Sequence, residues 1–301
     1  MSGLNKERSS ETLKQEALQA AAYQMERDRK EQKEKTQNQE DRKVLSDFLH
    51  CIAYGEQEKE EAMLKECSAL ALHKGNLRDP SEREFKGITG FQYAVWGLDW
   101  HMWRMLLKYM DKETAILQLS ELEEKETAHG KYFSLEPLVG ALNTFVESFD
   151  RWVPREREYH WCRVVGRLQL LLPVSVVNEY CHPSRSFEPL PSFKEESLLR
   201  SVNLFGSQGA WYTAIYTDTA LGVYNGKLGE KCGACRYSPV AARALVFPDK
   251  AYVKTDVEAI QHLWAVRQQQ IEELRTALRA CLILEEHLPK PIMSLILSYL
   301  R

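Results

Sequence analysis

Cysteine and histidine are the residue types in this chain that could carry chemistry, and two groupings bring them together. Cys232-Gly-Ala-Cys235 is a CxxC pair, and Cys181-His182 sets a thiol beside an imidazole. A structural zinc site needs four ligands, which CxxC pairs usually supply in twos. The other candidate ligands, His160, Cys162, Cys181 and His182, lack regular spacing. We therefore expect no metal and no other cofactor, with Cys232 and Cys235 as weak metal candidates.

A thiol nucleophile with an imidazole base is the second chemistry that these residues suggest. Cys181 and His182 would form the pair, and His160 and Asp99 would complete a polar cluster. Catalytic pairs of this kind are normally assembled from distant segments, whereas sequence neighbours seldom have the required geometry. We expect no catalytic residue, and an enzyme of unrecognised type that uses this Cys/His cluster is the alternative.

The stretch from Ile88 to Met110 carries three of the seven tryptophans and has the spacing of two short packed helices. It aligns without a gap to the ankyrin pattern, in which Gly-x-Thr-Pro-Leu-His-x-Ala precedes a second helix that ends in Leu-Leu. The matching residues are Gly87, Thr89, Ala94, Leu106 and Leu107, with Phe91 at the leucine position. This pattern favours a helical interaction scaffold over a catalyst.

The turn between these two helices, which holds Asp99, Trp100 and His101, and the helix residues beside it are predicted to bind a partner. They are Trp96, Asp99, Trp100, His101, Trp103 and Arg104. Tryptophan and arginine often dominate the binding energy of protein interfaces. Tryptophans at helical spacing are more often part of a core, so burial of the three indoles is the alternative.

The rest of the chain predicts a mainly α fold, an irregular ankyrin-like stack of helical hairpins with a small loop or β-hairpin insertion and a long C-terminal helix. Residues 1–43 are a charged helix or flexible arm, and 44–181 form the ankyrin-like domain. Within that domain we expect a helix at 58–72, a polar loop at 74–83, and an apolar helix face formed by Leu45, Phe48, Leu49, Ile52 and Ala53. A helix that ends at about Asp150 carries the apolar stripe Leu138, Leu142, Phe145, Val146 and Phe149, and two further helical segments meet near Pro173. Residues 182–253 are rich in loops, with a hairpin signal at Asn225-Gly226. Residues 254–301 are helices that pack on the helical domain.

The C-terminal helix is predicted in some detail. Thr255-Asp-Val-Glu258 reads as a capping box at its start. An apolar seam follows in steps of three and four, and Arg267 alone interrupts it; its members are Val257, Ile260, Trp264, Ile271, Leu274, Leu278 and Cys281. A short apolar helix at 288–300 resembles the first helix of an F-box, which offers an F-box-like adaptor as another alternative.

Composition limits the functional classes. The net charge of −3 argues against a nucleic-acid-binding surface. Seven scattered cysteines do not form an obvious disulfide framework and favour a reducing compartment. The chain lacks both a secretory signal and the ~20-residue apolar stretch of a transmembrane segment, so a soluble cytoplasmic protein is expected.

Three motifs together resemble a module of Legionella and Coxiella proteins, several of which are ankyrin-like or type IV secretion effectors. They are Phe91-Gln-Tyr-Ala-Val-Trp-Gly-Leu-Asp-Trp-His-Met-Trp103, His160-Trp-Cys-Arg-Val-Val-Gly166 and Asn178-Glu-Tyr-Cys-His-Pro-Ser-Arg-Ser-Phe187, within a resemblance that covers about residues 44–275. The resemblance implies a bacterial effector or secretion-associated adaptor that binds a host or bacterial protein. It implies the bacterial cytoplasm as location, with translocation into a host cell and a role in virulence left open.

Overall fold

The computed structural model describes residues 10–180, 187, 189–200 and 250–287. Its contacts divide the chain into two units, residues 1–47 and 48–301. In the first unit, helix α1 (Ser10–Tyr54) exposes every described side chain between Gln24 and Val44. Because this stretch buries nothing, its helix rests on backbone propensity and on pairs one turn apart, such as Arg27 with Glu31 at 3.3 Å.

The second unit begins with the last turns of α1. Their apolar face is the predicted one, and it buries Phe48, Leu49, Ile52 and Ala53. The helix ends where Gly55 adopts a φ of +72°, a conformation that glycine reaches without strain. Helix α2 (Gln57–Glu66) follows, and a 3₁₀ turn η1 (Ser68–Leu72) replaces the single helix that was predicted across 58–72.

A β-hairpin stands where the sequence predicted a polar loop at 74–83. Strand β1 (Gly75–Arg78) pairs antiparallel with β2 (Glu84–Ile88). The loop prediction was wrong because Asp79 closes a tight turn, its carboxylate accepting hydrogen bonds from the amides of Ser81 at 2.9 Å and Arg83 at 3.0 Å. The hairpin predicted near Asn225-Gly226 lies outside the described residues.

Two short helices then form the predicted pair. Helix α3 (Gly90–Trp96) starts with a capping box in which Thr89 and Gln92 exchange hydrogen bonds. Helix α4 (Trp100–Leu106) starts from Asp99, whose carboxylate accepts from the Met102 amide at 3.1 Å. A 3₁₀ turn η2 (Leu107–Tyr109) leads to α5 (Lys112–Lys125), which buries Ala115, Leu119 and Leu122.

Helix α6 (Glu136–Ser148) buries the predicted stripe through Leu138, Leu142 and Phe145. Helix α7 (Pro154–His160), a π-helical turn η3 (Trp161–Val165) and α8 (Gly166–Leu170) run on without a break. Pro173 then separates them from α9 (Val174–Tyr180), as the sequence predicted.

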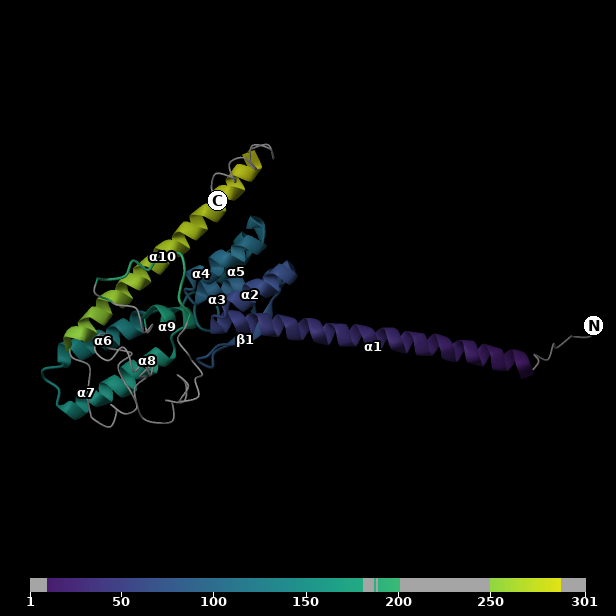
Figure 1. The fold of residues 1–301 in the computed structure, drawn as a ribbon, viewed down its shortest axis with the longest axis horizontal. Helices are drawn as coiled ribbons and strands as arrows, with labels where there is room; N and C mark the ends of the chain where they lie inside the picture. The colour runs from purple at the N-terminus through teal and green to yellow at the C-terminus, as the bar shows by residue number, and fades with distance from the viewer. Residues whose placement is uncertain (1–9, 181–186, 188, 201–249, 288–301) are drawn as a thin grey trace, which may run out of the picture. The chain divides into compact units, whose positions relative to one another are not determined.

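The long helix α10 (Lys250–His287) packs on α5 and α6 (Figure 1). It begins five residues before Thr255, so the predicted capping box is wrong: Thr255 sits inside the helix, and its hydroxyl donates to the Ala251 carbonyl at 3.3 Å. The seam is buried at Val257, Ile260, Ile271, Leu274 and Leu278.

The fold class is confirmed: the described chain is mainly helical, with a two-stranded antiparallel sheet and a long C-terminal helix. Within the described residues, no helix is long and apolar enough to cross a membrane. The tail at 288–300, predicted as an F-box-like helix, falls outside those residues.

Candidate functional site

The turn between α3 and α4 is the centre of the candidate site. Leu98, buried to 2% exposure, holds a φ of +60° there, in the left-handed region that non-glycine residues rarely occupy. The Ser175 hydroxyl on α9 donates to the Gly97 carbonyl at 2.9 Å. This strained turn is therefore fastened to α9, and Asp99, Trp100 and His101 follow it directly in the chain.

Six ionisable side chains gather beneath this turn and form what we call the charged cluster. They come from α2, the turn, α4, α9, the 189–200 segment and α10: Glu60, Asp99, His101, Glu179, Arg200 and Arg267. As whole residues the other five are at most 6% exposed, and the Arg200 side chain is 10% exposed. Charged groups at such depth need partners, since an unpaired buried charge is costly.

Asp99 and Arg200 form the first ion pair of the charged cluster. The Arg200 guanidinium donates to both carboxylate oxygens, at 2.8 and 2.6 Å, and its Nε donates to Gln57 Oε1 at 3.1 Å. Burial opposes ionisation of Asp99, but the charge and hydrogen bonds of Arg200 outweigh it and hold the pKa of Asp99 below its ordinary value. The pair fastens the end of the 189–200 segment to the α3–α4 turn.

Arg267 and Glu179 form the second pair, at 2.6 Å and with at most 2% of either side chain exposed. Arg267 also donates to the Phe193 carbonyl at 2.8 Å and to Gln270 Oε1 at 2.7 Å. The residue that interrupts the predicted apolar seam of α10 is thus paired within the interior. Arg267 thus attaches the first half of the 189–200 segment through the Phe193 carbonyl, and Arg200 attaches its end through Asp99.

His101 holds the middle of the same segment. Its Nε2 lies 2.8 Å from the Glu195 carbonyl, and burial lowers the pKa of the imidazole. The neutral ring therefore carries its proton on Nε2 and donates it to that carbonyl. With Arg267 and Arg200, His101 completes three attachments along 189–200.

Glu60 differs from its neighbours because neither carboxylate oxygen has a hydrogen-bond partner among the described residues. The side chain is fully buried. Burial first, and the negative charge of Asp99 second, raise the pKa of Glu60 well above its ordinary value. Glu60 therefore favours the neutral carboxylic acid, which suits its position beside an ion pair that is already balanced.

Above the charged cluster lies an open pocket of about 630 Å³. Its lining comes from Gly55–Lys59 and Glu61 on one side, from His101, and from residues 196–200 on the other. Glu56 pairs with Lys59 at 2.9 Å, and Glu61 pairs with Lys65 at 3.6 Å. The pocket thus has a polar rim, and the charged cluster forms its floor only at His101 and Arg200.

The six predicted partner-binding residues divide by depth. Trp96 and Trp103 are buried to 0% and 1% exposure and belong to the core. Asp99 and His101 support the 189–200 segment from below. Trp100 is half-buried and Arg104 is exposed, and the Arg104 guanidinium lies 4.5 Å from the centre of the Trp100 ring. Of the six predicted residues, Trp100 and Arg104 are the two that a partner can reach at the surface.

The residues of the enzymatic alternative do not share neighbours where the structure describes them. His160 contacts the Ala141 carbonyl at 2.8 Å, whereas Asp99 contacts Arg200. Cys181, His182, Cys232 and Cys235 lie outside the described residues. Among the residues that are described, no three His, Cys, Asp or Glu side chains form a group that could hold a metal ion.

Sequence reasoning missed Glu60, Glu179 and Arg200. Glu60 had a signal, because it lies one turn before buried Leu64 on the inner face of α2. Arg267 also had one, as the interruption of an apolar seam. Arg200 and Glu179 had none: their partners lie 101 and 88 positions away in the chain.

Comparison with known proteins gives one family. The chain is 31% identical over 269 residues to a protein of Coxiella burnetii described as uncharacterized protein CBUA0006, with 79% of this chain and 76% of that protein covered. Residues 137–278 match the family model of the CBUA0006 C-terminal domain. That match includes Glu179, Arg200 and Arg267 but not the α3–α4 turn. No solved structure matches the chain.

Proposed function

The chain belongs to the family of the Coxiella burnetii protein CBUA0006, and within that family we propose that it is a non-catalytic scaffold that binds another protein. The observation that carries the proposal is the pair formed by Trp100 and Arg104 at the surface of α4. The ankyrin-like pairing of α3 and α4 is part of the same proposal, because such helix pairs commonly present their turns to partners.

Trp100 and Arg104 are suited to binding because their geometry is set in advance. Arg104 stacks on one side of the indole at 4.5 Å, and Arg267 lies 5.9 Å from the ring centre. Cation–π contacts of this kind stabilise by about 0.5–2 kcal/mol and restrict both side chains. A partner that contacts them loses less side-chain entropy on binding.

The charged cluster supports the same proposal by what it does for the fold. Its two ion pairs and His101 attach the 189–200 segment to α4, α9 and α10. Asp99 is paired with Arg200 of the segment, and Glu179 is paired with Arg267, which donates to the Phe193 carbonyl of the segment. The cluster therefore stiffens the body that carries Trp100.

Affinity capture tests the proposal. The full chain, a Trp100→Ser/Arg104→Ser variant and an Arg155→Ser/Tyr159→Ser variant are immobilised and exposed to bacterial and mammalian cell lysates. The third protein is a matched control, since Arg155 and Tyr159 are also one turn apart and exposed, on α7. We expect a protein that the full chain and the control retain and the Trp100/Arg104 variant loses. Equal retention by all three, or no retained protein, contradicts the proposal.

The place of action is a further part of the proposal. We propose a bacterial effector or secretion-associated adaptor, supported by the relative from Coxiella burnetii and by the resemblance of the three motifs. A fusion to a reporter that is active only in host cytosol, expressed in bacteria with and without a type IV secretion system, tests it. A signal that needs the secretion system is expected. A signal from neither strain contradicts the effector role.

A further inference from the structure

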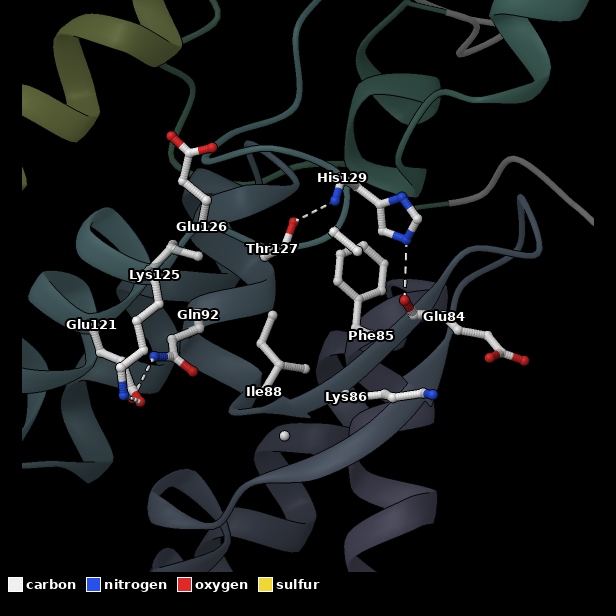
Figure 2. A pocket seen from close by; sticks show the side chains of 13 residues that line it. Glu84, Phe85, Lys86, Ile88, Gln92, Glu121, Lys125, Glu126, Thr127 and His129 are labelled. Atoms are coloured by element: carbon white, nitrogen blue, oxygen red, sulfur yellow. Dashed lines mark hydrogen bonds and ion pairs between the residues drawn. The ribbon is translucent and has the colours of Figure 1, made fainter.

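Glu60 is enclosed in the interior without a hydrogen-bond partner. The residue is 0% exposed, and neither carboxylate oxygen has a partner among the residues that the structure describes. Glu121, in the pocket of about 460 Å³ shown in Figure 2, has the usual arrangement: it accepts from Lys74 at 2.5 Å, Lys125 at 3.1 Å and Gln92 at 3.1 Å. These donors lower the pKa of Glu121 to about 2, whereas burial raises the pKa of Glu60 well above its ordinary value. Glu60 therefore keeps its proton where Glu121 gives its proton up.

Glu60 lies on the face of α2 that meets Arg200. Gln57, one turn earlier on the same helix, accepts a hydrogen bond from Arg200 Nε at 3.1 Å, and residues three apart on a helix share a face. The two Nη atoms of the same guanidinium donate to Asp99, at 2.8 and 2.6 Å. An ionised Glu60 would thus be a second negative charge beside one guanidinium that Asp99 already neutralises.

The other titratable groups around Glu60, Asp99 and Arg200 offer Glu60 no counter-charge. They are neutral, negative or already paired: Cys51, Lys59, Glu61, His101, Glu179 and Arg267. Burial raises the pKa of the Cys51 thiol to about 11 and lowers the pKa of His101, which leaves both groups uncharged. Ionisation of Glu60 therefore adds an uncompensated charge to the interior, and such a charge is costly.

We propose that Glu60 is a pH-sensitive switch for the end of the 189–200 segment. While Glu60 holds its proton, Arg200 stays on Asp99 and the segment is closed. When Glu60 gives its proton to water, Arg200 leaves Asp99, residues 196–200 move away, and water hydrates both carboxylates. The switch is separate from the surface of α4 that is proposed to bind a partner, so the two proposals can fail independently.

The rest of the segment stays attached. His101 donates to the Glu195 carbonyl at 2.8 Å, and an imidazole can do so in its neutral and in its charged form. Arg267 donates to the Phe193 carbonyl at 2.8 Å. Release is therefore confined to residues 196–200, which form one wall of the pocket of about 630 Å³.

The direction of the pH effect follows from proton binding. In the closed state burial raises the pKa of Glu60, and in the released state that pKa falls toward the unfolded value of about 4.3. The closed state binds more protons, so its advantage is complete below about pH 4.3 and is lost as the pH rises toward the closed-state pKa. The ratio of released to closed molecules changes by up to about tenfold per pH unit in that range.

Solvent exchange of the Arg200 Nε proton reports release, because Gln57 Oε1 accepts this proton while the segment is closed. Arg83 supplies the reference, since its Nε donates to Asp79 at 2.9 Å and its side chain is 13% exposed. Both protons are followed by NMR in one sample of the full chain with isotope-labelled arginine, so the pH dependence of the exchange reaction itself cancels in the ratio of the two rates. We expect the Arg200-to-Arg83 ratio to rise with pH in the parent, by up to about tenfold per pH unit above about pH 4.3.

Glu60→Gln and Glu60→Met remove the titrating group, and methionine is suitable because Glu60 has no hydrogen bond to lose. The ratio should not depend on pH in either variant. Glu58→Gln, exposed on the same helix, should keep the rise. A rise that persists in either Glu60 variant would overturn the proposal. So would a ratio that stays constant with pH in the parent, a result that needs no substitution to fold.

Discussion

Single substitutions should affect the stability of this protein most strongly where they leave a charge buried without its partner. Asp99 with Arg200 and Glu179 with Arg267 lie in the interior and are joined at 2.6 Å. Replacing such a pair by apolar residues is often neutral, whereas removing one partner is strongly destabilising because the other charge stays buried. Each pair here also attaches the 189–200 segment, so breaking it loosens that segment as well.

Arg200→Met should destabilise the protein by about 3–5 kcal/mol, because Asp99 is left buried without its partner. Thermal or denaturant unfolding measures the change. The double variant Asp99→Asn/Arg200→Met should recover much of the loss, since an asparagine keeps the cap on α4 and carries no charge. A double variant no more stable than Arg200→Met would show that the ion pair is not the cause.

Glu60→Gln should change how stability depends on pH. Burial raises the pKa of Glu60 in the folded protein above its unfolded value of about 4.3. The contribution of this group to stability is then complete below about pH 4.3 and is lost as the pH rises toward the folded pKa, by up to about 1.4 kcal/mol per pH unit. Glutamine does not titrate, so the Tm of the variant relative to that of the parent should rise as the pH rises above the unfolded pKa of about 4.3.

The matched control is Glu58→Gln, on the exposed side of the same helix. Because Glu58 is exposed, its replacement should not give the rise in relative Tm that is expected of Glu60→Gln. If the Tm of Glu60→Gln also changes with pH in the same way as that of the parent, the pKa of Glu60 is not raised in the folded protein.

The sequence predicted which residue types lie at the site, but it did not predict which of their side chains are buried. Trp96, Trp100 and Trp103 recur at helical spacing, yet two are core and one is half-exposed. Steps of three and four place residues on neighbouring positions of a helix, and only the surrounding elements decide which of them are covered. Asp99 shows the same limit, because Arg200 covers it from a segment about a hundred positions later.

At the scale of elements, the apolar face of α10 holds the second unit together. Leu274→Ala should cost about 2–5 kcal/mol, because Leu274 is 8% exposed on a helix that packs on α5 and α6. Thermal unfolding measures it, with exposed Glu273→Ala as the control. A variant that melts like the parent but changes its oligomeric state would make the seam an intermolecular coiled coil instead.

The contact between α1 and α3 is close enough to predict a steric effect. A Cβ at Gly90 would come within 2.1 Å of Ile52 Cδ1 and within 3.3 Å of Phe48 Cε1. Gly90→Ala should therefore destabilise by about 1–3 kcal/mol through overpacking. Ile52→Val removes the clashing Cδ1. The loss of unfolding free energy caused by Ile52→Val should therefore be smaller in the Gly90→Ala variant than in the parent. Additive effects of the two changes would argue against this contact.

Elements with long amphipathic faces were predictable, and short ones that depend on turns were not. The stripe of α6 and the seam of α10 repeat over several turns, so each position supports the next. The hairpin β1–β2 has strands of four and five residues, and its decisive feature is the Asp79 turn. Strands this short give too few alternating positions to separate them from a polar loop.

At the scale of the whole molecule, the described chain combines a buried charged cluster with a surface pair, Trp100 and Arg104. The Trp100–Arg104 pair sits on α4, and the charged cluster connects α4 with α9, α10 and residues 189–200. The proposed function depends on the surface at Trp100.

Site-specific photo-crosslinking tests that surface most directly. A benzophenone amino acid is placed at Arg104 in the full chain, and at Arg155 on α7 as the control, and cells are irradiated. The account predicts a discrete crosslinked product from position 104 that position 155 does not give and that Trp100→Ser abolishes. Identical products from both positions, or a product at 104 that persists without Trp100, would contradict it.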